Sequence, residues 1–198
     1  MREIRLATPG DAEAVAAIYA PYVEETPISF EYEPPGEDEM TQRIESTTET
    51  HPWLVCVESG EVVGYAYASE FATRTAYRWT VEVSGYVATD ERGRGVGRAL
   101  YGSLLAVLPR QGFLEAYAGV ALPNEESVGF HESMGFAHHA TYPSVGYKFG
   151  SWHDVGWWRR PLRDRPDDPD PPMALTEARA EPWWDDAVGA GAARLDEP

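Results

Sequence analysis

The chain has 198 residues and is 43% hydrophobic, which suits one globular domain with appendages and excludes wholesale disorder. A single cysteine, Cys56, excludes a disulfide framework and a multi-cysteine zinc site; without a membrane-length apolar stretch or a secretory signal, we expect a cytoplasmic protein that spans no membrane. The net charge of −17, with Lys148 as the only lysine, argues against nucleic-acid binding and would suit an acidic proteome in a high-salt cytoplasm.

The first third of the chain predicts one strand and two helices. Residues 3–7 alternate polar and apolar side chains, as a strand with one buried face does. Thr8-Pro9 is a typical helix start, and apolar residues at helical spacing follow over 15–23, where we expect Pro21 to kink or divide the helix. Residues 36–48 predict a second, more polar helix.

The middle and end of the body alternate strands and helices. A hairpin is predicted over 53–68, with its turn at Ser59-Gly60. The elements expected after it are a strand over 78–88, a helix over 95–110, a strand over 114–120, a helix over 124–134 and a closing strand from Tyr147. The order β-α-α-β-β-β-α-β-α-β-β indicates an α/β fold with a mixed sheet.

Composition changes near residue 160 and predicts a division of the chain. We expect residues 1–160 to form the domain and 161–198 an acidic, Pro-rich C-terminal tail, since 166–172 holds four prolines and cannot run as a helix or an inner strand. We interpret this tail as extended, with Trp183-Trp184 as its strong apolar anchor.

The segment Arg92-Gly93-Arg94-Gly95-Val96-Gly97-Arg98 is the most informative part of the sequence. It lies between a predicted strand and a predicted helix, and its glycines allow a backbone to approach a ligand closely. Amide groups at a helix start have no partner within the helix and attract anions. Together with three arginines on an acidic protein, these features suit a pyrophosphate.

We compared this segment with three known phosphate-binding sequence patterns, and only one of them fits. The dinucleotide fingerprint G-x-G-x-x-G fails, because Arg98 stands where its third glycine belongs, and the Gly-Lys-Ser/Thr phosphate loop is absent. The pattern R-x-x-G-x-G fits at Arg92, Gly95 and Gly97. It is similar to the coenzyme A pyrophosphate loop of the GNAT superfamily of N-acetyltransferases.

Residues 3–158 resemble the phosphinothricin and methionine sulfoximine acetyltransferase branch of that superfamily. The segments that carry the resemblance are Ile4-Arg5-Leu6-Ala7-Thr8, Ile18-Tyr19 through Phe30, Pro52-Trp53-Leu54-Val55, Gly64-Tyr65-Ala66-Tyr67-Ala68, Arg74 to Glu82, Leu122-Pro123-Asn124 through His131-Glu132, Gly146-Tyr147-Lys148 and Trp152-His153-Asp154-Val155-Gly156. The resemblance implies the GNAT fold, a splayed seven-stranded mixed sheet with flanking helices, and commonly a homodimer.

The resemblance also implies which residues bind acetyl-CoA, the acetyl donor. Main-chain groups of Tyr86 and Val87 would meet its acetyl and pantetheine arm, Asn124 would contact the same arm, and the loop would hold its pyrophosphate. The loop residues expected to bind are Gly93, Arg94, Gly95, Val96, Gly97 and Arg98. Phe30, Arg74 and Tyr77 would shape the acceptor pocket, and Arg74 could pair with a carboxylate.

Two residues are expected to carry the proton transfers. Glu82 corresponds to the general base proposed for the family, and His131 to its other proton-transfer residue, as acid or as base. A base is needed because an α-amino group is mostly protonated near pH 7. The remaining histidines show no convincing metal-ligand arrangement, so we predict no metal.

We therefore predict an acetyl-CoA-dependent N-acetyltransferase that acts by direct attack on the α-amino group of a small amino acid or analogue. Phosphinothricin and methionine sulfoximine or sulfone are acceptors of this type. The alternatives are acetylation of a protein N-terminus or a polyamine, and a non-catalytic module that binds acetyl-CoA.

Overall fold

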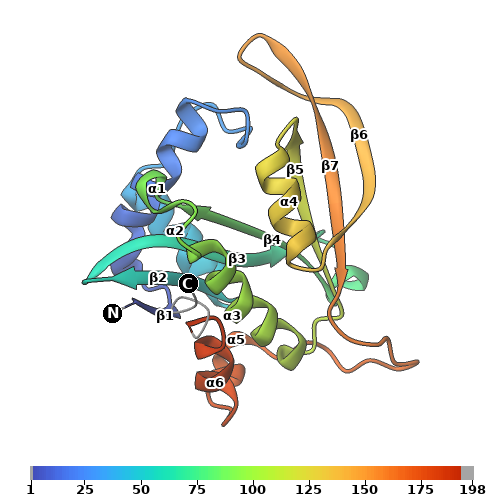
Figure 1. Cartoon of the computed structure of the whole chain (residues 1–198). Coiled ribbons are helices and arrows are strands. Elements are labelled where there is room, and N and C mark those ends of the chain that lie inside the picture. The colour runs from blue at the N-terminus through green and yellow to red at the C-terminus, as the bar shows by residue number, and fades with distance from the viewer. Residues whose placement is uncertain (1, 193–198) are drawn as a thin grey trace.

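A mixed sheet of seven strands runs through residues 2–192, the part of the chain that this computed structural model describes (Figure 1). The strand order is β1-β2-β3-β4-β5-β7-β6, and β4 and β5 are parallel while the other neighbours are antiparallel. The strands are β1 (Arg2–Leu6), β2 (Trp53–Glu58), β3 (Glu61–Glu70), β4 (Thr80–Val87), β5 (Glu115–Leu122), β6 (Ala137–Lys148) and β7 (Ser151–Pro161).

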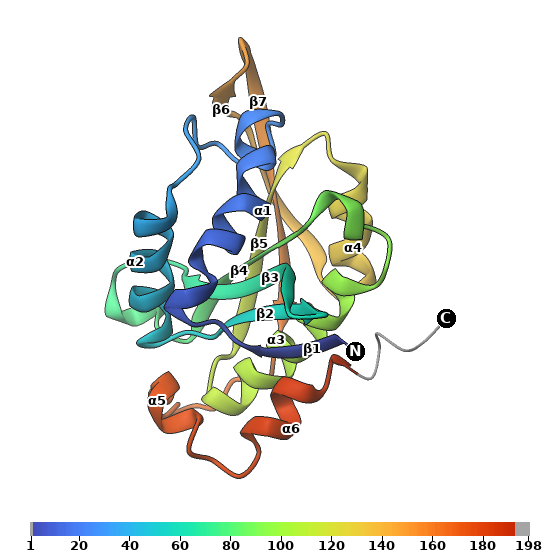
Figure 2. The ribbon, with the colours of Figure 1, turned by 90° about the vertical axis from the view of Figure 1, so that its left-hand side faces the viewer.

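Helices cover both faces of the sheet (Figure 2). On one face, α1 (Ala12–Glu24) and α2 (Glu37–Thr48) bury a core with the inner side chains of β2 and β3. On the other face, α3 (Val96–Gln111) packs its buried leucines at 100, 104 and 108 against the sheet, with α4 (Glu125–Ser133) beside it. The hairpin of β6 and β7 extends beyond the rest of the sheet (Figure 1).

The predicted order of strands and helices is confirmed, and two local expectations need correction. Pro21 does not divide α1, which continues to Glu24, because the proline lies in the last turn and removes only its own intrahelical N–H bond. The strand expected from residue 78 begins at Thr80, because Arg78 closes a short 3-10 turn over Thr75–Tyr77.

The C-terminal segment differs from the expected extended tail. It holds two short helices, α5 (Leu175–Ala178) and α6 (Trp184–Gly189), and α6 packs against α3 and β1 (Figure 1). Leu175, Trp184 and Val188 are buried in the same core as α3. Prolines prevent long helices here but not short ones, and a few spaced apolar side chains are enough to dock them. Of the predicted tail, residues 193–198 lie outside the described part, and the division at residue 160 stays a prediction.

Candidate active site

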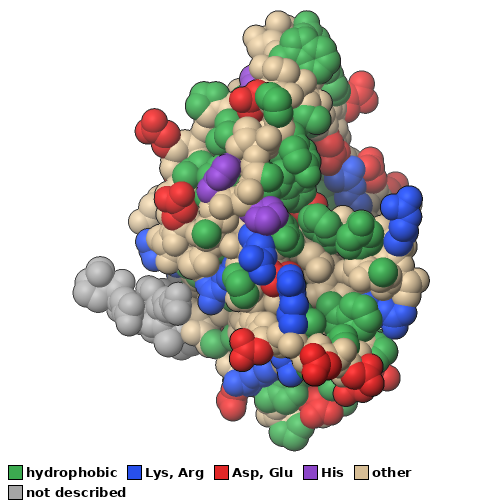
Figure 3. Space-filling view, turned by 90° about the vertical axis from the view of Figure 1, so that its right-hand side faces the viewer, with side chains coloured by type: hydrophobic (Ala, Val, Ile, Leu, Met, Phe, Trp, Pro, Cys, Tyr) green, Lys and Arg blue, Asp and Glu red, His purple; other side chains and the backbone are tan. Residues whose placement is uncertain are grey.

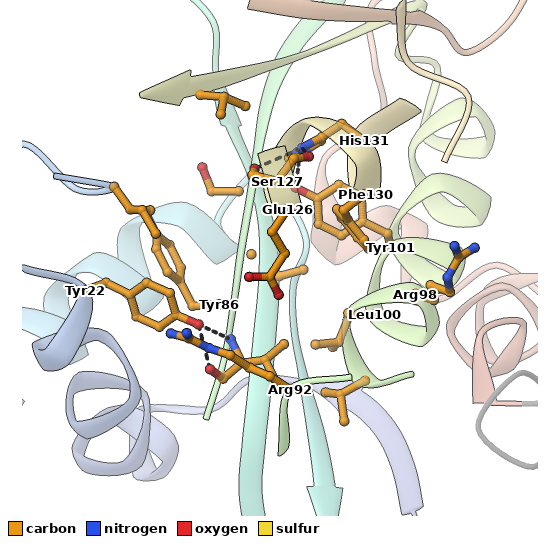
Figure 4. A pocket seen from close by; sticks show the side chains of 18 of the residues that line it. Tyr22, Tyr86, Arg92, Arg98, Leu100, Tyr101, Glu126, Ser127, Phe130 and His131 are labelled. Carbon is orange, nitrogen blue, oxygen red and sulfur yellow. Dashed lines mark hydrogen bonds between the residues drawn. The ribbon is translucent and has the colours of Figure 1, made fainter. Parts of the chain in front are cut away.

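The two central strands separate and leave a cavity between them. β4 and β5 pair over three positions only, Thr80–Glu82 with Glu115–Tyr117. Beyond Glu82 the strands diverge, and a cavity of about 430 Å³ lies between residues 83–87 of β4 and 119–121 of β5. The loop before α3 and the inner side of α4 complete its wall (Figure 4).

The peptide groups of β4 alternate between β3 and this cavity. The Ala88 N–H donates to the Val63 carbonyl of the neighbouring strand β3 at 3.0 Å, so the even-numbered residues of β4 bond toward β3. The N–H and C=O groups of Val83, Gly85 and Val87 therefore face the gap. Tyr86 reaches the cavity with its side chain, and its peptide groups are directed at β3.

Tyr22 from α1 occupies part of this free strand edge. Its hydroxyl donates to the Val87 carbonyl at 2.7 Å and accepts from the Val87 N–H at 3.3 Å (Figure 4). The Arg92 guanidinium carbon lies 4.7 Å from the centre of the Tyr22 ring, in cation–π contact. A ligand that binds the Val87 peptide groups must therefore displace a hydroxyl that already satisfies them.

The glycine-rich loop has the backbone that its sequence predicts. Gly93 and Gly95 have φ of 75° and 83°, a conformation that favours glycine. Gly95 is the N-cap of α3, and the first amides of a helix have no intrahelical acceptor. Predicted loop residues that line the cavity are Gly93, Gly95, Val96, Gly97 and Arg98.

Arg94 is the exception in this loop, because its side chain does not line the cavity. Its guanidinium pairs with Glu91 at 2.5 Å, and its carbonyl accepts from Arg2 at 2.9 Å. Arg2 also bonds Glu58 and Glu91 at 3.0 and 2.8 Å. This network fixes the loop to the N-terminal edge of the sheet.

His131 and Asn124 line the cavity from the side of α4. Asn124 is the N-cap of α4, and its Oδ1 accepts from the Ser127 N–H at 3.1 Å. His131 is buried; its Nδ1 lies 2.8 Å from the Ser127 carbonyl and its Nε2 3.1 Å from the Tyr101 hydroxyl. Burial lowers the pKa of His131, so its ring is neutral near pH 7.

Glu82, half-buried in the last paired position of β4, does not itself line the cavity but lies beside it, next to the lining residue Gly119. Like Tyr86, it projects from the sheet face that carries α1 and α2. A side chain on Gly119 would come within 3.7 Å of the Glu82 carboxylate, so this glycine leaves room beside it. Burial raises the pKa of Glu82, which makes the carboxylate a stronger base than one in water.

The three predicted acceptor-pocket residues do not line this cavity. The Tyr77 ring lies 6.1 Å from Phe71, which in turn contacts Tyr117 and Trp157 beside Glu82. Arg74 is exposed on the same loop. The Phe30 ring packs against Gly146, where any side chain would clash with it, and faces His153 at 6.1 Å.

Lys148 joins the two sides of the open sheet. It ends β6, and its Nζ donates to the carbonyls of Val23, Thr26 and Ser29 at 2.5, 3.0 and 2.7 Å. Only 2% of Lys148 is exposed. The segment after α1, which carries Phe30, is thereby tied to the β6–β7 hairpin.

Sequence reasoning missed Tyr22, Tyr101 and the role of Lys148. Both tyrosines occur in the apolar patterns of their helices, and such a pattern does not reveal where a hydroxyl points. Among residues 2–192, no group of three or more His, Cys, Asp or Glu side chains could hold a metal ion. No helix in that part of the chain combines the length and apolarity needed to cross a bilayer.

Comparisons with known proteins identify the family. The family described as "Acetyltransferase (GNAT) domain" matches residues 4–157. Phosphinothricin N-acetyltransferase of Streptomyces viridochromogenes is 39% identical over 175 residues, covering 88% of this chain and 95% of that protein. The methionine sulfoximine/methionine sulfone acetyltransferase of Salmonella typhimurium is 39% identical over 105 residues, 53% of this chain and 61% of that protein.

A solved structure has the same fold. The crystal structure of a phosphinothricin acetyltransferase from Sinorhizobium meliloti in complex with AcCoA is 31% identical, with a TM-score of 0.81 over 88% of this chain and 98% of its own. The seven-stranded mixed sheet and flanking helices of this chain are therefore the GNAT fold that the sequence predicts. The chain belongs to the GNAT acetyltransferase family.

Proposed function

We propose that the protein transfers the acetyl group of acetyl-CoA to the α-amino group of a small amino acid or analogue, of the phosphinothricin or methionine sulfoximine type. The observation that carries this proposal is the gap between β4 and β5, which combines a free strand edge, a helix N-terminus and a buried carboxylate. The names of the relatives support the acceptor class.

The residues that line the cavity suit acetyl-CoA. Its pyrophosphate would lie against the main-chain amides of residues 93–98, assisted by the side chains of Arg92 and Arg98. The pantetheine amides would pair with the free edge of β4 at Val83, Gly85 and Val87, with Asn124 opposite, after Tyr22 has moved away from Val87. The thioester supplies an activated acetyl carbon.

Glu82 accepts the proton that the acceptor must lose before attack. The carboxylate lies beside Gly119, which lines the gap that the acetyl group would enter, and burial raises its pKa and makes it a stronger base. The aromatic residues around Trp157, with Tyr77 and Arg74 on the adjoining loop and Phe30 at the hairpin, form the acceptor side. His131 on the opposite face handles the departing thiol.

We further propose that the enzyme works as a cytoplasmic homodimer. The β6–β7 hairpin supports the dimer, because hydrophobic side chains gather at its exposed end (Figure 3). β6 is the edge strand of the sheet, with one side unpaired. The negative net charge supports a high-salt cytoplasm as the setting.

The direct test measures thiol release from acetyl-CoA with a panel of amino acids, sulfoximines, phosphinothricin, polyamines and peptides. We expect turnover with amino acids or their analogues. Glu82→Gln should lower kcat by about 100-fold or more with unchanged acetyl-CoA affinity, as for loss of a general base. Glu70→Gln, an exposed carboxylate on β3, is the matched control. Turnover of only peptides or polyamines would overturn the acceptor class, and an unchanged kcat in Glu82→Gln would remove it as the base.

A further inference from the structure

The hydrogen bonds of His131 fix which of its nitrogens carries the proton. Nδ1 lies 2.8 Å from the Ser127 main-chain carbonyl, which can only accept, and 3.3 Å from the Ser127 hydroxyl, which can also accept; Nδ1 therefore carries the hydrogen, directed at the nearer carbonyl. In a neutral ring Nε2 then has a lone pair. Its neighbour, the Tyr101 hydroxyl at 3.1 Å, must therefore donate to it (Figure 4).

Tyr101 is held in this position by packing on every side. Its ring lies on Gly85 of β4, where a side chain would come within 2.9 Å of it, and it packs edge-to-face on Phe130, His131 and Phe136. Only 3% of Tyr101 is exposed, yet it lines the cavity beside the free edge of β4. Both nitrogens of His131 are thus engaged, and the Tyr101 oxygen is the hydrogen-bond partner of Nε2.

The two proton-handling groups lie on opposite sides of the gap. Glu82 projects from the face of the sheet that carries α1 and α2, whereas Tyr101 and His131 come from α3 and α4 on the other face. An amine that arrives as an ammonium ion loses two protons on becoming an amide. The first proton must leave before attack and the second only after the N–C bond has formed, so two separate acceptors suit the chemistry.

We infer that Tyr101 is a further proton-transfer residue, which works with His131 as a relay that carries the second amine proton to the departing sulfur. This inference rests on the proposed function. After Glu82 has taken the first proton, the amine nitrogen bonds to the acetyl carbon. The Tyr101 oxygen takes the second proton while its own proton moves to His131 Nε2. As the C–S bond breaks, Tyr101 donates a proton to sulfur and regains one from Nε2. Both residues end as they began, and the relay consumes no further reactant.

The kinetic test uses Tyr101→Phe, which removes one oxygen and keeps the ring. We expect kcat to fall by about 100-fold, the scale of a lost general acid–base group, with the acetyl-CoA dissociation constant unchanged within twofold by calorimetry. His131→Ala should cost a similar factor, and the double variant little more than either single change, because members of one relay are not additive. A kcat in Tyr101→Phe within twofold of the wild type, or losses that multiply in the double variant, would overturn the relay.

A second readout needs no turnover. In the free protein, ¹⁵N resonances of labelled histidine should show His131 protonated at Nδ1 and not at Nε2, and Ser127→Ala should keep this form because the acceptor is a main-chain carbonyl. Tyr101→Phe should raise the pKa of His131, since it removes the donor to Nε2. A proton on Nε2, or a pKa that does not move, would contradict the inference. If the wild type neither binds acetyl-CoA nor turns over, the proposed function itself fails; if it does both while Tyr101→Phe matches it, only the relay fails.

Discussion

At the residue scale, burial moves the pKa values of Glu82 and His131 toward each other. A buried carboxylate loses hydration of its charged form, so its pKa rises above the usual 4.5, while the pKa of the buried imidazole falls below the usual 6.5. Glu82 must be ionised to accept a proton, and His131 must be neutral to accept one from Tyr101. Both requirements are met on the alkaline side of the two pKa values.

The expected consequence is a single acid limb in the pH profile of kcat. Activity should fall as the pH falls, because Glu82 gains a proton at a pH above its usual 4.5, whereas His131 becomes charged only below its usual 6.5. Steady-state kinetics with both substrates saturating measures the limb. A limb below pH 4.5 would show that Glu82 is not desolvated, and a kcat that does not fall on the acid side would show that neither residue acts as a proton acceptor.

The sequence predicts some of these residues better than others. The loop of Gly93 and Gly95 is predictable because positive φ angles and a helix start leave a residue pattern that few other structures need. Tyr22 and Tyr101 leave no such trace, since a tyrosine in an apolar stripe has the same spacing whether its hydroxyl meets solvent, Val87 or His131. Resemblance supplied Glu82 and His131 as candidates, and their catalytic roles stay proposals.

At the scale of elements, Lys148 fastens the segment after α1 to the end of β6. Three carbonyls surround its ammonium group and match its three donors, so the buried charge is fully hydrogen-bonded. Tyr32 reinforces this join by donating to the Tyr147 carbonyl at 2.5 Å. These contacts set where Phe30 lies relative to the hairpin. The sequence gives no sign of this, because a lone lysine on a strand is usually solvated.

Replacing Lys148 with methionine should loosen the acceptor side and leave the acetyl-CoA side intact. Loss of the ammonium leaves three buried carbonyls unpaired, so we expect the free energy of unfolding to fall by about 3 kcal/mol, the low end for three buried polar groups that each cost roughly 1–3 kcal/mol when unsatisfied. The acceptor KM should rise by about tenfold, equivalent to ~1.4 kcal/mol of lost binding, with little change in acetyl-CoA affinity.

Urea unfolding and steady-state kinetics measure the two effects of Lys148→Met. Lys148→Arg should recover part of the stability, because a planar guanidinium keeps the charge but cannot direct its donors to the same three carbonyls. An acceptor KM equal to that of the wild type in a folded Lys148→Met enzyme would separate this lysine from acceptor binding.

At the scale of the whole molecule, the sheet is two halves joined over three residue pairs, with a C-terminal segment packed beneath α3. The halves and their order follow from strand and helix patterns that extend over many residues. The extended tail expected from composition is wrong because five buried hydrophobic residues are spread through an acidic, Pro-rich stretch: Leu175, Ala178, Trp184, Ala187 and Val188. The average composition of a segment hides a few apolar side chains of this kind, whereas packing against the domain depends on each of them.

The exposed end of the β6–β7 hairpin leads to a prediction about the assembly. Val145, Phe149 and Trp152 expose more than half of their surface, as residues of a subunit contact do in an isolated chain. Sedimentation velocity should give the mass of a dimer, and Trp152→Glu should shift it to the mass of the monomer. A monomer at all protein concentrations would contradict the dimer.

The net charge of −17 predicts that salt stabilises the protein. In molar KCl, which screens this charge, the melting temperature should rise. Full stability at low ionic strength with no gain in salt would contradict the high-salt setting.

The most direct test of the whole account is a crystal structure of the protein with acetyl-CoA. We expect the diphosphate on the amides of residues 93–98 and the pantetheine arm along Val83–Val87, with the Tyr22 hydroxyl displaced from Val87. The thioester should then lie between Glu82 and Tyr101. Acetyl-CoA bound elsewhere, or an empty gap between β4 and β5 at saturating ligand, would contradict the account.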